Sequence, residues 1–246
     1  MLQVIAFDCY GTLEDIHTDE SRPCVWLTMA NLMRYHGADW TPEALQSAYS
    51  AQLDAQASAL RTQKGDDAVE VDLAETFRLL YAEKGVIADD ALCAEAMRVF
   101  RAVSTDYFRL YPGTKEMLQS LRSAGARIAL LSNAQRLFTE PELRSLGIWE
   151  DFDAIFISSD YGVKKPAKAF YQQLLDWANV PPSQIMMVGN SPTDDILCAT
   201  RYGLRTAYIP SKLTGTDEPQ VAHADVTLDA PDMPALTQLL LRQLAE

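Results

Sequence analysis

The chain is poor in cysteine, histidine and basic side chains, and each shortage excludes a class of protein. Its four cysteines are scattered without a CxxC pair, which argues against a disulfide framework and indicates reduced thiols. No two of its three histidines stand at metal-ligand spacing. The net charge of −13 disfavours nucleic acid and anionic membranes as partners. An anionic substrate would therefore need a local positive site.

Long apolar runs are also missing. None approaches the roughly 20 residues of a membrane helix, and the start, MLQVIAFD, lacks the basic-then-apolar pattern of a signal peptide. No GxGxxG follows the first apolar run, which disfavours a nucleotide-binding oxidoreductase. These absences predict a cytoplasmic protein without a membrane or nucleic-acid partner.

What the sequence does contain is a regular alternation of short apolar runs and helical patterns. The runs have the length and composition of buried parallel strands, and alternation of this kind predicts an α/β fold with a doubly wound parallel sheet. The expected strands are 3–8, 127–132, 153–158, 184–189, 205–210 and, more weakly, 224–228. The expected helices are 112–125, 169–180, 192–203 and 233–246.

One stretch interrupts the alternation. Residues 17–108 show no convincing strand, and four helices are expected there instead: 23–36, 42–62, 72–84 and 89–108. This predicts a helical domain inserted into a core made of 1–16 and 109–246. Because the first strand delivers the chain to the ligand-binding edge of the sheet, the insert is expected to act as a lid. Residues 211–222 are expected to form an exposed loop.

Polar residues stand where the predicted strands end. Carboxyl ends of parallel strands meet at one edge of the sheet, so these side chains are expected to share a crevice. They are Asp8 and Thr12, Ser132 and Asn133, Lys164 and Lys165, and Asn190, Asp194 and Asp195.

This set resembles the motifs of the haloacid dehalogenase superfamily of hydrolases. The DxxxT motif corresponds to Asp8–Thr12, the strand-terminal serine to Ser132, the lysine before proline to Lys165, and the acidic cluster to GNSPTDD. The resemblance covers nearly the whole chain and implies a cap domain at the helical insert. It implies a hydrolase of a small anionic metabolite.

The resemblance also implies a role for each motif. Asp8 would attack the substrate and form a covalent aspartyl intermediate. Lys165 would keep Asp8 ionised, and Thr12 completes the catalytic set. Ser132 would hold developing negative charge. Asp195 would orient a metal or a water. The substrate itself is expected to contact Tyr10, Gly11 and Asn133.

Tyr10 points to one subclass. Phosphatases of the superfamily usually have an aspartate at this place, which protonates the leaving alkoxide. A phenol is a poor base at neutral pH, whereas a halide leaves without a proton. The first motif, DCYGT, resembles the DxYGT of 2-haloacid dehalogenases. The sequence therefore favours, slightly, hydrolysis of a carbon–halogen or similarly activated bond.

The fourth motif points to the other subclass, a magnesium-dependent phosphatase. Gly189 is phosphatase-like, and Asn190 stands where a magnesium-binding aspartate usually lies. If Mg²⁺ is bound, its ligands would come from Asp8, Tyr10, Asn190 and Asp195; a dehalogenase-like enzyme would need no cofactor.

Three further points stay open. The altered motifs also allow a catalytically weak binding or regulatory protein. Arg22, Arg34 and Arg61 are candidates for gripping a substrate carboxylate. The chain is expected to be a monomer or a homodimer.

Overall fold

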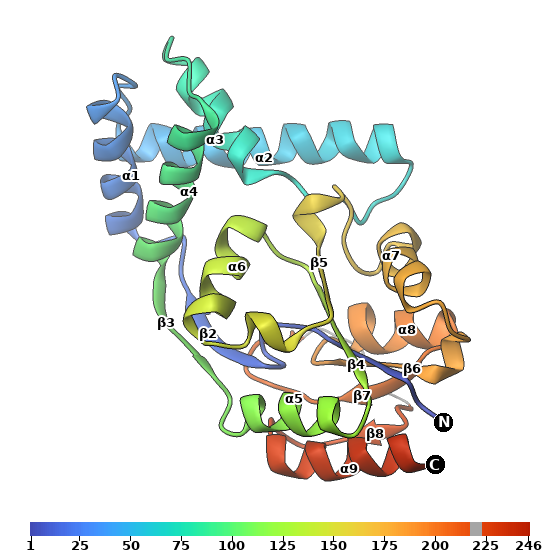
Figure 1. The fold of residues 1–246 in the computed structure, drawn as a ribbon. Coiled ribbons are helices and arrows are strands. Elements are labelled where there is room, and N and C mark those ends of the chain that lie inside the picture. Colours follow the sequence, from blue (N-terminus) through green and yellow to red (C-terminus); the bar gives the residue numbers. More distant parts are fainter. Residues whose placement is uncertain (217–222) are drawn as a thin grey trace.

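The computed structural model describes residues 1–216 and 223–246, so part of the expected loop 211–222 lies outside the described residues. Its centre is a six-stranded sheet in the order β5-β4-β1-β6-β7-β8, with every neighbouring pair parallel. The strands are β1 (Val4–Phe7), β4 (Arg127–Ser132), β5 (Ala154–Ile157), β6 (Ile185–Gly189), β7 (Arg205–Tyr208) and β8 (Val226–Thr227). All six expected strands are present, and the fold is the predicted doubly wound α/β sheet (Figure 1).

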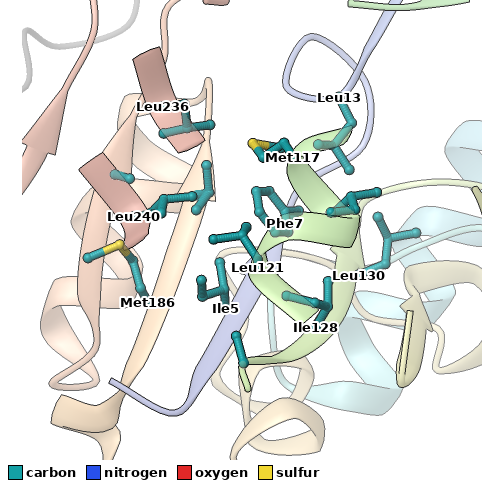
Figure 2. Packing of buried hydrophobic residues seen from close by; sticks show 14 of the residues in the cluster. Ile5, Phe7, Leu13, Met117, Leu121, Ile128, Leu130, Met186, Leu236 and Leu240 are labelled. Atoms are coloured by element: carbon teal, nitrogen blue, oxygen red, sulfur yellow. The ribbon is translucent and has the colours of Figure 1, made fainter. Parts of the chain in front are cut away.

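Helices cover both faces of the sheet because β1 alternates its side chains between them. Ile5 and Phe7 join the apolar cluster under α5 (Thr114–Ser123) and α9 (Met233–Ala245), shown in Figure 2. Val4 and Ala6 join the cluster on the opposite face, which contains residues of α7 and α8. Those helices are α7 (Lys168–Ala178) and α8 (Cys198–Arg201). The remaining short helical turns are η1 (Trp149–Asp151), η2 (Ser158–Asp160) and η3 (Pro182–Gln184).

The inserted segment folds as a group of helices with its own core. The helices are α1 (Pro23–Tyr35), α2 (Pro42–Lys64), α3 (Leu73–Ala82) and α4 (Asp90–Ser104). Thr41, Asp72 and Asp89 cap the last three, each accepting a backbone N–H of the first turn. In the core the ring of Phe100 lies 5.7 Å from Trp26, 5.4 Å from Tyr49 and 5.7 Å from Phe77, centroid to centroid.

The expectation of helix to residue 108 was wrong. After α4 the chain forms β3 (Thr105–Leu110), which pairs antiparallel with β2 (Glu14–Thr18). Alone, either segment is too short and too polar to be recognised as a strand. Each is stabilised by the other, for example through the Asp15–Arg109 ion pair at 2.8 Å. This two-stranded ribbon connects the core to the helical insert (Figure 1).

Two other helices differ from expectation. Helix α6 (Arg136–Ser145) was not predicted, because its interior Pro141 lowers helix propensity. Helix α6 packs against α4, and this contact stabilises it despite the proline. The expected helix 192–203 begins instead as a π-helical segment, η4 (Pro192–Leu197), which α8 continues. None of the described helices is both long and apolar enough to cross a membrane.

Candidate active site

Asp8 follows β1 and is almost completely buried, with 7% of its surface exposed. Its Oδ1 accepts from Lys165 Nζ at 2.8 Å and from Ser132 Oγ at 3.2 Å. Its Oδ2 accepts only long hydrogen bonds, from Thr12 Oγ1 at 3.4 Å and from the amide nitrogen of Asn190 at 3.3 Å. One carboxylate oxygen is therefore held by a cation and a hydroxyl, while the other is the less restrained.

Lys165 joins two carboxylates. Its Nζ also donates to Asp195 Oδ1 at 2.6 Å, and Asp195 Oδ2 accepts from the backbone N–H of Ser191 at 2.9 Å. Burial by itself lowers the pKa of Lys165, but the charges of Asp195 and Asp8 outweigh it and raise that pKa. Burial also raises the pKa of Asp195, and Lys165 opposes this change. A single ammonium thus balances two buried acids.

Asn133 connects the segments that follow β4, β5 and β6. Its Oδ1 accepts from the Lys165 backbone N–H at 2.7 Å, and its Nδ2 donates to the Lys165 carbonyl at 3.0 Å and to Asp194 Oδ2 at 3.2 Å. Asp194 therefore faces Asn133, whereas Asp195 faces the ammonium of Lys165. The hydrogen bonds from the Asn133 side chain hold the backbone of Lys165 in place. The Lys165 side chain is thereby directed toward Asp8.

Gly11 allows the turn after β1 to approach the fourth strand end. Its φ of +80° suits glycine, and a Cβ there would lie 2.6 Å from Ser211 Oγ and 2.7 Å from the amide of Asn190. The amide of Asn190 lies beside this turn. Its nitrogen donates to Asp8 Oδ2 at 3.3 Å and to the carbonyl of Tyr10 at 3.2 Å, and its oxygen accepts from Ser211 Oγ at 3.3 Å.

The residues beside this turn test the expectation of a Mg²⁺ site. The Asn190 nitrogen donates to Asp8 Oδ2 and to the Tyr10 carbonyl, and of these two oxygens only that of Asp8 carries charge. Both oxygens of Asp195 already have partners. Among residues 1–216 and 223–246, no three His, Cys, Asp or Glu side chains are grouped to hold a metal. With one carboxylate, the residues present fit Mg²⁺ poorly, and no step below depends on it.

Tyr10 does not turn its hydroxyl toward Asp8. The hydroxyl donates to Glu142 Oε2 at 2.6 Å and lies 2.9 Å from Thr139 Oγ1, both on α6. Burial, with the charge of Glu142 adding to it, raises the pKa of Tyr10 well above its ordinary value. The phenol therefore stays protonated, and it is oriented by α6, away from the nucleophile.

Asp8 lines a cavity of about 240 Å³, together with Lys165, Asp195 and the residues that follow β6. A second, of about 430 Å³, extends between the core and the helical insert and shares Tyr10 and Asn133 with the first. Gln135 ties the two parts together here, since its amide donates to the carbonyl of Val71 at 2.8 Å. The insert thus lies over the crevice, as a lid would.

The structure separates the three candidate arginines. Arg22 pairs with Asp106 at 2.5 Å and Arg34 with Asp39 at 2.7 Å, and neither lines the cavity, whereas Arg61 does. Sequence reasoning missed Arg101, on α4, which lines the same cavity. Its only sequence signal is its place among the polar residues of an amphipathic helix, which says nothing about what it meets.

Comparison with known proteins agrees with this geometry. A family model described as haloacid dehalogenase-like hydrolase matches residues 2–203, and the chain belongs to this family. It is a hydrolase of a family that contains both phosphatases and dehalogenases.

The similar curated proteins include phosphatases, and the similar solved structures include both dehalogenases and phosphatases. Glyceraldehyde 3-phosphate phosphatase of Methanothermobacter thermautotrophicus is 31% identical over 130 residues, 53% of this chain and 58% of that protein. The chain spans about half the length of the curated relatives it matches. The 2-haloacid dehalogenase of Pseudomonas syringae pv. tomato DC3000 superposes with a TM-score of 0.66 at 21% identity, covering 99% of this chain and 100% of that one. A HAD phosphatase of Thermococcus onnurineus gives a TM-score of 0.61 at 19% identity, covering 97% and 98%. At such identities these structures show the fold alone.

Proposed function

We propose that this hydrolase cleaves an activated bond, such as carbon–halogen, in a small anionic molecule through an ester on Asp8. The observation that carries the proposal is the position of Tyr10. Its hydroxyl is engaged by Glu142 and Thr139, so Asp8 has no acid–base group from the first motif beside it. Such help is worth about 10²–10⁴ in rate where a leaving group must be protonated. A halide needs none.

The first step uses the less restrained oxygen. Asp8 Oδ2 attacks the substrate carbon, the carbon–halogen bond breaks, and halide leaves with the bonding pair. Lys165 and Ser132 hold Oδ1 during this displacement, at 2.8 and 3.2 Å. They therefore orient the carboxylate and keep it ionised.

The second step hydrolyses the ester. Water attacks the Cγ carbon of Asp8, and negative charge develops on Oδ1, where the same two donors stabilise it. Asp195 shares the ammonium of Lys165 with Asp8 and accepts the proton of the attacking water. Burial raises the pKa of Asp195 above that of an ordinary carboxyl, which strengthens it as a base. The bond between Cγ and Oδ2 then breaks, and Oδ2 takes the proton from Asp195 and leaves as the hydroxyl of the alcohol product. The water oxygen stays on Cγ, and Asp8 releases its proton to solvent and becomes a carboxylate again.

A second candidate, phosphate-ester hydrolysis, is favoured by one observation. Curated proteins similar to this chain include a glyceraldehyde 3-phosphate phosphatase and a phosphoglycolate phosphatase.

Parallel assays separate the candidates. Halide release from 2-haloacids and phosphate release from p-nitrophenyl phosphate with Mg²⁺ are measured for the parent, Asp8→Asn and the surface control Asp39→Asn. Halide release that only Asp8→Asn abolishes supports the proposal. Phosphate release without halide release favours the second candidate. Activity toward neither leaves a binding protein.

A further inference from the structure

Asn190 lies beside the nucleophile, at the place that the sequence assigns to a magnesium ligand. Strands β1 and β6 are parallel neighbours, and the backbone N–H of Asp8 donates to the carbonyl of Val188 at 2.9 Å. Asn190 comes two residues after Val188, so its side chain meets the carboxylate of Asp8. The residue is buried, and its contacts are therefore with protein groups.

Both ends of the Asn190 amide have partners. The nitrogen carries two hydrogens and faces two acceptors, Asp8 Oδ2 at 3.3 Å and the carbonyl oxygen of Tyr10 at 3.2 Å. The amide oxygen accepts from Ser211 Oγ at 3.3 Å. The backbone carbonyl of Asn190 accepts from Thr214 Oγ1 at 2.9 Å, which ties the residue to the loop after β7. The amide is thus held from both sides.

The nitrogen of this amide joins two oxygens that a cation could otherwise bridge. Divalent cations in proteins are bound by oxygens that converge on them, carboxylate and backbone carbonyl oxygens among them. Asp8 Oδ2 and the Tyr10 carbonyl converge instead on an NH₂ group, which directs one hydrogen to each. The amide therefore bridges these oxygens without adding charge.

The other oxygens that the sequence assigns to a metal also have partners. Asp8 Oδ1 accepts from Lys165 Nζ and from Ser132 Oγ. Asp195 Oδ1 accepts from Lys165 Nζ, and Asp195 Oδ2 accepts from the backbone N–H of Ser191. A cation would have to displace a hydrogen bond at each of these ligands.

Charge balance explains why a neutral side chain suits position 190. One ammonium, that of Lys165, lies 2.8 Å from Asp8 Oδ1 and 2.6 Å from Asp195 Oδ1. An aspartate at position 190 would add a third carboxylate, and a buried charge without a partner is strongly unfavourable. A neutral donor avoids this cost. It also leaves the negative charge on Asp8 Oδ2, which a bound cation would partly withdraw.

We propose that Asn190 takes the place of a metal ion in this hydrolase, holding the attacking oxygen of Asp8 so that the reaction needs no Mg²⁺. The attack on carbon rests on the function proposed above. Asn190 is a positioning residue, because it acts through Asp8 and the turn at Tyr10. Its hydrogen bond to Oδ2 is longer than the bond from Lys165 to Oδ1, so it orients the nucleophile and leaves it free to attack.

Metal binding tests the proposal without any substrate. Mg²⁺ is titrated calorimetrically into the parent, Asn190→Asp and the control Asn31→Asp, which makes the same change at an exposed position of α1. The parent and the control are expected to show no binding up to about 1 mM Mg²⁺. Asn190→Asp is expected to bind about tenfold or more tightly than the parent. A parent Kd below about 1 mM, or Asn190→Asp that binds no better than the parent, overturns the inference.

Thermal unfolding provides a second readout, because a third buried carboxylate can destabilise the folded protein. Mg²⁺ is expected to raise the Tm of Asn190→Asp and to leave the Tm of the parent and of Asn31→Asp unchanged. An equal rise in all three proteins would contradict a cation position created at residue 190.

The rate of ester formation on Asp8 tests the positioning role. Asn190→Ala removes both N–H donors, and Asn190→Ser restores one. In single turnovers of a 2-haloacid with EDTA present, the Asp8 ester is followed by mass spectrometry. Asn190→Ala is expected to form it about 10- to 100-fold more slowly than the parent, with Asn190→Ser between them and KM little changed. A purely structural loss would lower the fraction of protein that reacts and leave the rate of that fraction unchanged.

Two results of this assay overturn the inference. One is ester formation by Asn190→Ala within twofold of the parent, and the other is a parent that EDTA inactivates and Mg²⁺ restores. A parent that forms no ester and releases no halide would refute the proposed function instead. The Mg²⁺ titrations and the unfolding measurements need no substrate, so they would still decide whether Asn190 replaces a cation.

Discussion

Glu14 offers a test of the electrostatics at the junction between core and insert. It begins β2, is fully buried, and its Oε1 has no hydrogen-bond partner among the described residues. Its Oε2 is contacted only weakly, by Cys9 Sγ at 3.7 Å. Burial, and then the charge of Glu142, raise the pKa of Glu14 from 4.5 to about 8, against the opposing effect of Arg101. The folded protein therefore keeps Glu14 neutral at pH 7.

The raised pKa of Glu14 makes the free energy of unfolding depend on pH. In the unfolded chain this carboxyl ionises near pH 4.5, so between 4.5 and about 8 the folded state binds the extra proton. Stability is then lost as pH rises through this window and levels off above it. At pH 7 the cost is at most about 3 kcal/mol. A neutral isostere, Glu14→Gln, removes the proton difference and is expected to unfold with a shallower pH dependence.

Urea unfolding of both proteins at pH 5, 6, 7 and 8 measures this. The stability advantage of Glu14→Gln, relative to its value at pH 5, is expected to grow by about 1 kcal/mol per pH unit and to level off near pH 8. The exposed Glu116→Gln serves as control. A difference between wild type and Glu14→Gln that does not change with pH would refute the assignment of a neutral carboxyl.

Three further substitutions probe the catalytic crevice. Lys165→Met leaves Asp8 and Asp195 buried without a cation, and is expected to cost about 3–5 kcal/mol in urea unfolding and to abolish halide release; activity within tenfold of wild type would contradict this. Asn190→Asp adds a second carboxylate beside Asp8 and is expected to tighten Mg²⁺ binding about tenfold or more in calorimetry; an unchanged isotherm would exclude a cation position there. Gly189→Ala would place a Cβ 2.2 Å from the carboxylate of Asp195, so it is expected to lower stability by about 1–3 kcal/mol and to lower activity; unaltered unfolding and turnover would show that Asp195 can move aside.

Much of the core could be predicted because the signals are local. The β-strands of the sheet are short apolar runs, and a buried parallel strand needs little else. The helices of the insert could be predicted from the spacing of their apolar residues and from the residues that cap them. The grouping of Asp8, Ser132, Lys165 and Asp195 followed from topology alone, since parallel strands bring their carboxyl ends to one edge.

The junction between core and insert could not be predicted in the same way. Strands β2 and β3 pair across more than 80 positions of sequence, and each is stable only with the other. Helix α6 contains a proline and is stabilised by packing against α4. Local propensity is a weak guide wherever such contacts decide.

The sequence by itself determined the sheet, the helical insert and the set of polar strand ends that meet beside Asp8. Only the tertiary structure decided which way Tyr10 points and what Arg101 contacts. Both depend on Glu142, which lies more than 40 positions from Arg101 and more than 130 from Tyr10. The physical reason is that motif residues are placed by the strand that carries them, whereas a buried ion pair between two helices exists only once those helices have packed.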